Sequence, residues 1–517
     1  MTLSAPLKIA IERAVDHLRC FPDTDIFPCT LDGVKFFKDR DAAIVAVTHL
    51  HNNFDEIVTS NPPELIRSLI PTGYSSYRLG TQIPHLWNAY YLSLVISCAA
   101  EIERTRASSK IVFSYRFDAK SDHTSFFDST IGWTAFTNAT MELCNHHSHV
   151  LVTDISDFYH RISLSTLITC LQRSNVSIEL ISRLDHLLVL LGINHYGLPI
   201  GGPASRILAE LALTNLDKNI IKLGIPYLRF VDDFRIFSDN ESQAQKNLLT
   251  ITDLIIREGL SLNKSKTRIV RSRDMREELE LNQSLALLLD KPNSTPQKIL
   301  ELTPNDPYSE MRAQVDQELA RYISEPNSED GIWNEFAKPR INLSLARNLL
   351  SAMRFMAPEQ LGPLLLKLLS SSDRPAMLPI FARLIEAIQT NLSRLNSEDK
   401  LAMQEQLIRF VLRKDSVASV DLHRSMAIRT LCALPQKNGH SLSLDLLESL
   451  RSETSSLVRR EGLALCIARN DQIALEAMSS SQTFGTWERS IALMSPTDIN
   501  SLTEATFKSE VPQIKVT

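Results

Sequence analysis

Two adjacent aspartates between short apolar runs are the feature that most constrains how this chain can fold. In PYLRFVDDFRIFS (226–238), Asp232 and Asp233 separate two runs that are typical of β-strands. A solvated turn is one interpretation, but the segment lacks the glycine usual in a tight hairpin. The apolar neighbours predict partial burial instead, and two buried like charges are unfavourable unless a cation binds them. The pattern therefore favours a metal-binding hairpin.

A third aspartate follows a separate apolar run. In HVLVTDISDFY (149–159), residues 150–152 predict a buried strand, and Asp154 stands at its end. Asp154 and Ser156 also precede a helical stretch, so these residues taken alone favour helix capping. Together with the aspartate pair, however, Asp154 would complete a set of carboxylates suited to two Mg²⁺ ions in phosphoryl transfer.

Two further segments have the composition of nucleotide-binding elements. YGLPIGGPASRILAELAL (196–213) places glycines, including Gly201, before a predicted helix whose start offers N–H groups to an anion. An ordinary loop-to-helix junction gives the same pattern. GLSLNKSKTRIV (259–270) carries Lys264 and Lys266 in a predicted turn and strand, and arginines follow it. The alternative for this basic stretch is a solvated charged face.

The chain beyond residue 310 is predicted to be entirely helical. Short amphipathic pieces of similar size are separated by Ser, Asp and Pro turns, for example at 344–356, 377–389, 423–434 and 458–469. A stacked helical-repeat array and a plain helical bundle both explain this pattern. Four prolines predict a linker before it: Pro292, Pro296, Pro304 and Pro307.

The four central segments, in their order, resemble motifs A, B, C and D of reverse transcriptases. Motif A would be DISDFY, motif B GLPIGGPAS, motif C FVDD and motif D LSLNKSKT. The resemblance covers roughly residues 78–270, and Asp154 lies 78 residues before Asp232, a spacing typical of that family. Motif B departs from the commoner pattern at Ile200, where many members have a polar residue, and at Arg206, where proline is frequent.

Upstream segments resemble the phage-defence, abortive-infection branch of bacterial reverse transcriptases. These segments are DTDIFP (23–28), YRLGTQIPHLWNAYYLSLV (77–95) and VFSYRF (112–117). The resemblance implies an α+β chain, in which a right-hand-like palm and fingers polymerase core precedes an all-α helical-repeat (HEAT-like) domain. The implied divisions are fingers at 1–150, a palm with motifs A to D at 150–285, and the helical-repeat domain at 310–517.

The resemblance also implies a role for each matching residue. The catalytic carboxylates would be Asp154, Asp232 and Asp233. Those side chains and the Ile155 carbonyl would hold two Mg²⁺ ions, with Mn²⁺ as a substitute. The residues expected to bind the nucleotide are Arg78 at the triphosphate, Ile155, Tyr159 beside the ribose 2′ position, Gly201, and Lys266 near the leaving pyrophosphate. Tyr159 would exclude a 2′-hydroxyl sterically, and a core tyrosine at a strand end is an equal alternative.

The composition limits the class of protein and the cellular compartment in which it is expected. The 517 residues allow two to four domains, and the net charge of −5 argues against a uniformly basic nucleic-acid coat protein. Seven cysteines without a C-x-x-C pair favour free thiols in a reducing compartment. Because the chain shows no secretory apolar core and no run of membrane-spanning length, we expect a cytoplasmic protein without a membrane partner.

Two functions from different classes follow. The first is an RNA-directed or untemplated DNA polymerase, a nucleotidyltransferase that acts in antiphage defence. It would bind deoxynucleoside triphosphates and an RNA template or DNA product. Synthesis would start from a nucleic-acid primer or from one of the protein's own tyrosine hydroxyls. The protein is a candidate homo-oligomer. The second is a catalytically silent polymerase fold that presents the helical array to a partner. The presence of all three aspartates favours the first.

Overall fold

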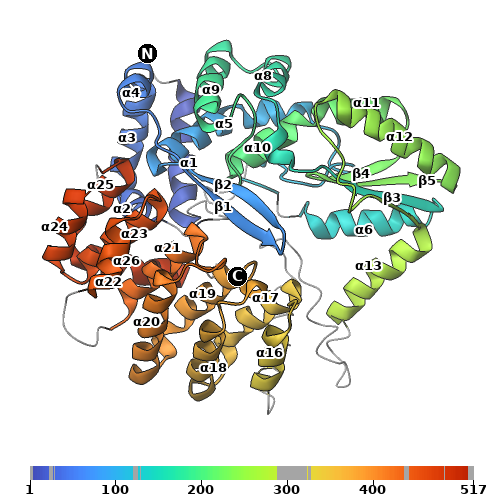
Figure 1. Ribbon diagram of the computed structural model, residues 1–517. Coiled ribbons are helices and arrows are strands. Elements are labelled where there is room, and N and C mark those ends of the chain that lie inside the picture. Colours follow the sequence, from blue (N-terminus) through green and yellow to red (C-terminus); the bar gives the residue numbers. More distant parts are fainter. Residues whose placement is uncertain are drawn as a thin grey trace.

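The computed structural model describes three regions that differ in their elements. A helical N-terminal part with a β-hairpin is followed by a four-stranded sheet with helices and then by a helical C-terminal part (Figure 1). The described residues are 4–21, 27, 30–119, 126–128, 130–287, 323, 328–435, 442–481 and 484–509. The four prolines of the predicted linker lie outside these ranges.

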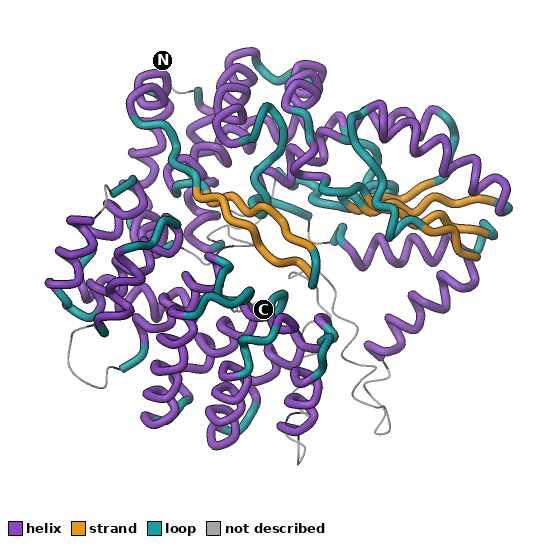
Figure 2. The backbone as a smooth tube through the Cα atoms, viewed as in Figure 1, coloured by secondary structure: helices purple, strands orange, loops and turns teal. Residues whose placement is uncertain are grey.

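The N-terminal part is built around one long helix. Its helices are α1 (Ala5–Cys20), α2 (Leu31–Lys38), α3 (Arg40–Asn52), α4 (Phe54–Ser60) and α5 (His85–Thr105). Most residues of α5 are buried because α1, α3 and α9 (Ile178–Leu191) pack around it. Strands β1 (Ile66–Gly73) and β2 (Ser76–Gln82) pair antiparallel and form a separate two-stranded sheet near the centre of the molecule (Figure 2).

The larger sheet has four antiparallel strands in the order β4–β5–β3–β6. These strands are β3 (His149–Asp154), β4 (Tyr227–Phe230), β5 (Asp233–Ser238) and β6 (Arg268–Arg271). Because side chains alternate along a strand, Leu151 and Ile236 are buried on one face, and Val150, Val152 and Phe237 on the other. Apolar residues on both faces require a cover of helices on both sides.

Helices supply that cover. On the Val150 face lie α6 (Trp133–Cys144) and α13 (Ser272–Leu287), and on the opposite face lies α12 (Glu241–Arg257). The other helices of this region are α7 (Phe158–Arg161), α8 (Leu164–Arg173), α10 (Pro203–Ala212) and α11 (Thr214–Lys222). Since α9 and α10 both pack on α5, one hydrophobic core runs through the N-terminal part and the sheet.

Every element described between residues 328 and 509 is helical. The elements are α16 (Ser328–Ala337), α17 (Leu343–Ala352), η2 (Met353–Phe355), α18 (Pro358–Ser370), η3 (Pro375–Met377), α19 (Phe381–Asn391), η4 (Leu392–Arg394), α20 (Ser397–Leu412), α21 (Asp421–Ala433), α22 (Leu444–Arg451), α23 (Ser456–Ala468), α24 (Gln472–Ser481), α25 (Thr486–Ala492) and α26 (Pro496–Ser509). Helices α17, α19, α21, α23 and α25 contact one another in succession, and so do α16, α18, α20, α22 and α24. The helices therefore stack in two layers, and their assignment to a HEAT-like family stays a prediction.

The C-terminal helices hold the β1–β2 hairpin at two places. Arg460 of α23 is fully buried and donates to Gln82 Oε1 at the end of β2, at 2.8 Å. Near the hairpin turn, the Tyr74 hydroxyl donates to the Ile341 carbonyl at 2.7 Å. The C-terminal part is therefore packed on the hairpin of the N-terminal part.

The predicted mixed helix and strand class is confirmed, and so is the helical C-terminal region. None of the helices in the described ranges has the length and apolar character that crossing a membrane requires.

Candidate active site

The larger sheet brings the three predicted catalytic aspartates to one end. Asp154 is the last residue of β3 and Asp233 the first of β5, and the antiparallel register pairs them directly. Asp232 occupies the turn before β5, and its carbonyl accepts a hydrogen bond from the Ile155 N–H at 3.2 Å. Like charges opposite each other on neighbouring strands are destabilising. This end of the sheet therefore carries an electrostatic cost.

Lys266 supplies a positive charge at this end of the sheet. Its ammonium lies 2.5 Å from Asp154 Oδ2, and the side chains are 63% exposed for the lysine and 6% for the aspartate. The loop that carries Lys266 is fixed to β3 because the Asn263 N–H donates to the Asp154 carbonyl at 2.9 Å. Helix capping by Asp154 is wrong, since Asp157 is the residue that precedes α7 and no side chain caps that helix.

Burial and neighbouring charges shift the pKa values of the titratable side chains in this cluster. Burial, and next the charge of Asp233, raise the pKa of Asp232 to about 7. Burial also raises the pKa of Asp233, although Arg235 and Lys266 oppose that shift. Burial alone would lower the pKa of Lys266, but the hydrogen bond and charge of Asp154 raise it above its ordinary value. Near neutral pH, the Asp232 carboxyl is therefore expected to carry a proton for part of the time.

The residues at this end of the sheet suit a divalent cation. Asp154 Oδ1 is buried and receives no hydrogen bond, which leaves a strong acceptor unsatisfied. Carboxylate and carbonyl oxygens are also the ligands that Mg²⁺ prefers. Across the described ranges, no three His, Cys, Asp or Glu side chains already surround a common point. The ammonium of Lys266 lies on Asp154 Oδ2, so a cation that binds through that oxygen has to displace it.

The predicted nucleotide-binding loop lies beside Tyr159. The Leu198 N–H donates to the Tyr159 carbonyl at 2.9 Å. Gly201 has φ +121°, a backbone conformation that only glycine adopts readily. Gly202 is the N-cap of α10, and the helix has no side-chain cap at this end. The start of α10 is thus compatible with binding an anion, as the sequence predicts.

Tyr159 is packed close to the candidate catalytic residues. It lies against the core shared by the N-terminal part and the sheet. Burial raises the pKa of its hydroxyl well above its ordinary value, and Tyr115, Arg206 and Asp232 are near enough to affect it. The Arg206 guanidinium lies 5.0 Å from the centre of the Tyr115 ring. Both interpretations of Tyr159, core packing and sugar selection, are compatible with this position.

No contact in the described structure joins Arg78 to the carboxylates. Arg78 is exposed on β2 and pairs with Ile70 of β1, so it shares a hairpin face with Ile70 and Gln82. That face packs toward the C-terminal helices. On the opposite face, Arg67 donates to the Gly192 carbonyl at 2.9 Å, in the loop after α9. Binding of a triphosphate by Arg78 stays a prediction.

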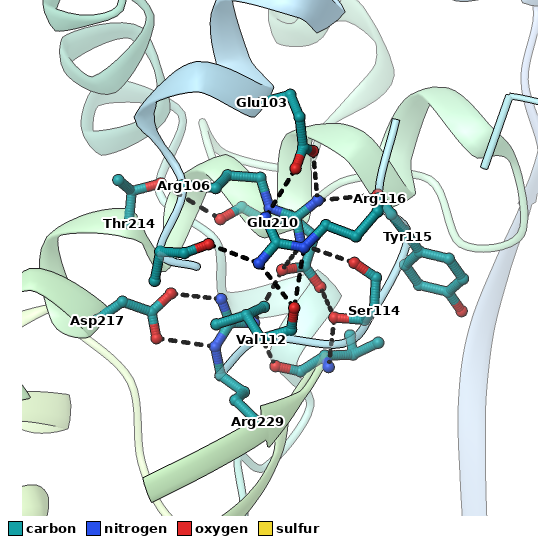
Figure 3. Close-up of polar contacts among 12 residues, drawn as sticks. Glu103, Arg106, Val112, Ser114, Tyr115, Arg116, Glu210, Thr214, Asp217 and Arg229 are labelled. Carbon is teal, nitrogen blue, oxygen red and sulfur yellow. Dashed lines mark hydrogen bonds and ion pairs between the residues drawn. The ribbon is translucent and has the colours of Figure 1, made fainter. Parts of the chain in front are cut away.

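A buried ionic network lies beside the aspartate turn (Figure 3). Arg229 of β4 is fully buried, and it donates to Asp217 at 3.0 and 2.5 Å and to Glu210 at 3.0 Å. Arg106 donates to the same Glu210 oxygen at 2.8 Å. Burial alone would raise the pKa of Glu210, but Arg229 and Arg106 hold it below its ordinary value. Removing one partner of such a pair costs roughly 3–5 kcal/mol, so this region depends on the whole network.

The same network contacts the residue before Asp232. Val231 has φ +54°, which is strained for a β-branched side chain. Its N–H donates to the Ser114 hydroxyl at 2.9 Å, and its carbonyl accepts from Arg229 at 2.8 Å. These bonds explain how a tight turn forms without glycine. None of the network residues was among the predicted site residues. The sequence signal that could have identified these network residues is a charged residue inside an apolar run, as with Arg229 and Glu210.

The arginines after Lys266 form surface ion pairs. Each has an acidic partner in α13 at 2.8 to 3.0 Å: Arg268 with Glu278, Arg271 with Asp274, Arg273 with Glu277, and Arg276 with Glu280. This arrangement favours the solvated charged face over a free basic groove.

Comparisons with known proteins identify the sheet region. Residues 106–300 match the family model described as reverse transcriptase (RNA-dependent DNA polymerase). No curated protein matches the chain. A solved structure of telomerase from Candida albicans, in complex with the TWJ fragment of telomeric RNA, has 10% sequence identity and a TM-score of 0.28. The match covers 79% of this chain and 68% of that one, but a TM-score this low carries no argument.

The chain thus contains a reverse transcriptase domain at residues 106–300, and all four predicted motifs fall inside it. Polymerases of this family generally use divalent metal ions, in agreement with the fit of the carboxylate cluster.

Replacing Asp232 with asparagine should stabilise the metal-free protein at alkaline pH. The ordinary pKa of the aspartate is 3.8, whereas that of folded Asp232 is about 7. Between these values the folded protein holds a proton that the unfolded protein has lost, so stability falls as the pH rises towards 7. After a discount for solvent screening, we expect Asp232→Asn to raise the free energy of unfolding by roughly 1–3 kcal/mol at about pH 8 in EDTA.

Urea unfolding at several pH values measures this effect, and the gain should shrink below pH 7 and vanish near about pH 4. The control is Asp185→Asn, the same substitution at an exposed residue of α9, which should change little. An Asp232→Asn protein no more stable than the wild type at pH 8 would contradict the pKa increase that burial and the charge of Asp233 cause at Asp232.

Proposed function

We propose that this chain is a DNA polymerase of the reverse transcriptase type that acts in antiphage defence by two-metal nucleotidyl transfer. One observation carries the proposal: Asp154, Asp232 and Asp233 meet at one end of a sheet inside the region that matches the reverse transcriptase family. Proteins retain unfavourable local arrangements mainly at functional sites, and an inert fold gains nothing from three adjacent carboxylates.

In this proposal the chain's own residues bind and orient the reactants. Asp154 and Asp232 hold both Mg²⁺ ions, for which Mn²⁺ is a substitute, and Asp233 and the Ile155 carbonyl support them. When bound, the two ions would supply positive charge that offsets the negative charge of the reacting oxygens. Lys266 is largely exposed, so its ammonium can leave Asp154 for the departing pyrophosphate.

The start of α10 and the loop at Gly201 bind phosphate or base in this proposal, and Arg78 grips the triphosphate. The substrates are deoxynucleoside triphosphates, and the nucleic-acid partner is an RNA template or an untemplated DNA product. The proposed units are fingers at 1–150, palm at 150–285 and a HEAT-like domain at 310–517. The proposal also includes a cytoplasmic location and a homo-oligomeric assembly. Sequencing the nucleic acid that copurifies with the protein tests which template it uses.

Asp232→Asn tests the enzymatic proposal because it removes charge and keeps size. We expect incorporation of labelled deoxynucleotides to fall by about 10²-fold or more, with loss of phage protection and an unchanged circular dichroism spectrum. Asp185→Asn should retain both activities. Full protection by a soluble Asp232→Asn protein that makes no DNA would instead support the alternative, a silent scaffold whose helical array binds a partner.

Tyr159→Ala tests the sugar choice. Removing the ring should open space for a 2′-hydroxyl and raise the ratio of ribonucleotide to deoxynucleotide incorporation by about tenfold or more. Competition assays with both nucleotides measure this ratio, and Phe355→Ala, which removes an exposed aromatic ring from η2 in the C-terminal part, is the control. An unchanged ratio in Tyr159→Ala would assign this residue to the core alone.

Priming by a protein hydroxyl is the last part of the proposal. Of the described tyrosines, Tyr77 and Tyr196 are half exposed, whereas Tyr90 and Tyr91 are buried and the Tyr74 hydroxyl is hydrogen-bonded. Exposed phenols are the better candidates because a primer has to reach the carboxylates and accept a nucleotide.

The experiment uses purified protein, labelled deoxynucleotides and Mg²⁺ without an oligonucleotide. Label that stays with the denatured protein and is released by nuclease supports protein priming, and its loss in Tyr77→Phe or Tyr196→Phe identifies the residue. Label that appears only when a primer is added, and then separates from the protein, would show a conventional primed polymerase.

A further inference from the structure

The turn that carries Asp232 is held by residues from three separate segments. Ser114 follows α5, Glu210 belongs to α10 and Arg229 to β4, and all three are buried. The Ser114 hydroxyl donates to Glu210 Oε1, and Arg229 donates to Glu210 Oε2 at 3.0 Å. Figure 3 shows Ser114, Glu210 and Arg229 pointing toward one another.

The direction of these hydrogen bonds fixes the role of Ser114. A serine hydroxyl has one proton, and Glu210, which is held in its charged form, can only accept it. The remaining lone pairs of the hydroxyl are then available to the Val231 N–H, which lies 2.9 Å away. Glu210 therefore orients Ser114, and Ser114 in turn holds Val231.

Val231 needs to be held because its backbone conformation is unfavourable. A β-branched residue at φ +54° is strained, and such strain persists only where the surroundings over-determine the conformation. Here the N–H is held by Ser114 and the carbonyl by Arg229, at 2.8 Å. A relaxed Val231 would change the direction of the next residue, Asp232, whose carbonyl is bonded to Ile155 beside Asp154.

We propose that Ser114 is a positioning residue: through Val231 it keeps the Asp232 carboxylate beside Asp154, in the geometry that binds divalent cations. Because Glu210 lies in α10, the same bonds connect the helix that follows the Gly201 loop to the turn that carries Asp232. This inference rests on the proposed polymerase function, but a readout of metal binding separates the two.

The test compares Ser114→Ala with wild type and with Ser425→Ala in the full chain. Ser425 in α21 is as fully buried as Ser114, and its hydroxyl donates to the Leu422 carbonyl at 2.8 Å, so the control deletes the same atom in the C-terminal helices. Ser114→Ala leaves Glu210 paired with Arg229, which makes it a milder change than any substitution of those charged residues. Ser114→Cys keeps the volume but accepts hydrogen bonds weakly, and it serves if the alanine variant does not fold.

Binding of Mn²⁺, followed by electron paramagnetic resonance, is the readout that does not depend on synthesis. We expect Ser114→Ala to weaken Mn²⁺ binding by about tenfold and to lower kcat for DNA synthesis by about 10- to 100-fold. The KM for deoxynucleotides should stay within about threefold of wild type, because the residue does not touch the nucleotide. Ser425→Ala should match the wild type in Mn²⁺ binding and in synthesis.

Folded Ser114 variants that match the wild type in Mn²⁺ affinity and kcat overturn the proposal. A wild-type protein that binds Mn²⁺ but makes no DNA overturns the polymerase function only, and the Mn²⁺ affinity of Ser114→Ala then decides the role of Ser114. A wild-type protein that binds no Mn²⁺ overturns both.

Discussion

Repulsion between three carboxylates at one end of a sheet is the constraint on which the rest of this region depends. Two unit charges about 4 Å apart repel by about 4 kcal/mol at an effective dielectric constant of 20, against a typical domain stability of about 5–15 kcal/mol. The protein limits this repulsion in two ways. Lys266 lies on Asp154, and the raised pKa of Asp232 lets that group carry a proton near neutral pH. Both compensations are reversible, since a lysine with an exposed side chain can move and a proton can leave.

The buried ionic network lies behind the three carboxylates. Its charged groups cannot compensate by moving into solvent or by losing a proton. Arg229 is fully buried and its charge is balanced by Asp217 and Glu210, while Arg106 balances the second acid. The bonds tie together segments near residues 106–116, 210–217 and 229–231, which are distant in sequence. Removing any one charge leaves the remaining buried charges unbalanced. A buried and fully paired ionic network behind the carboxylates is compatible with the proposed metal site.

The sequence predicts which carboxylates gather at one end of the sheet because the signals for them are local. Asp154 and Asp233 stand at strand ends in apolar runs, and antiparallel pairing of those strands places them opposite each other. Lys266 is predicted to lie near the leaving pyrophosphate, and in the structure its ammonium contacts Asp154. Ser114 gives no such signal, because a single serine after a helix has no periodicity and its partners come from distant segments.

Contacts between distant segments also determine how the hairpin that carries Arg78 is packed, so the sequence alone does not predict that packing. The sequence predicts no strands there, and only the three-dimensional packing shows that the Gln82 face of β1 and β2 meets Arg460 of the C-terminal helices. The helical character of residues beyond 328 follows from amphipathic periodicity. The two-layer stacking, in which each helix contacts the next but one, depends on contacts that a single sequence does not reveal.

The most direct test of the metal-dependent site is a structure of the full chain with Mg²⁺ and a non-hydrolysable deoxynucleoside triphosphate. We predict cations bound by Asp154 and Asp232, with Lys266 moved from Asp154 to the phosphates and the turn at Val231 unchanged. A structure in which Lys266 remains on Asp154 and no cation binds there, although nucleotide is present at saturating concentration, would contradict the proposed site.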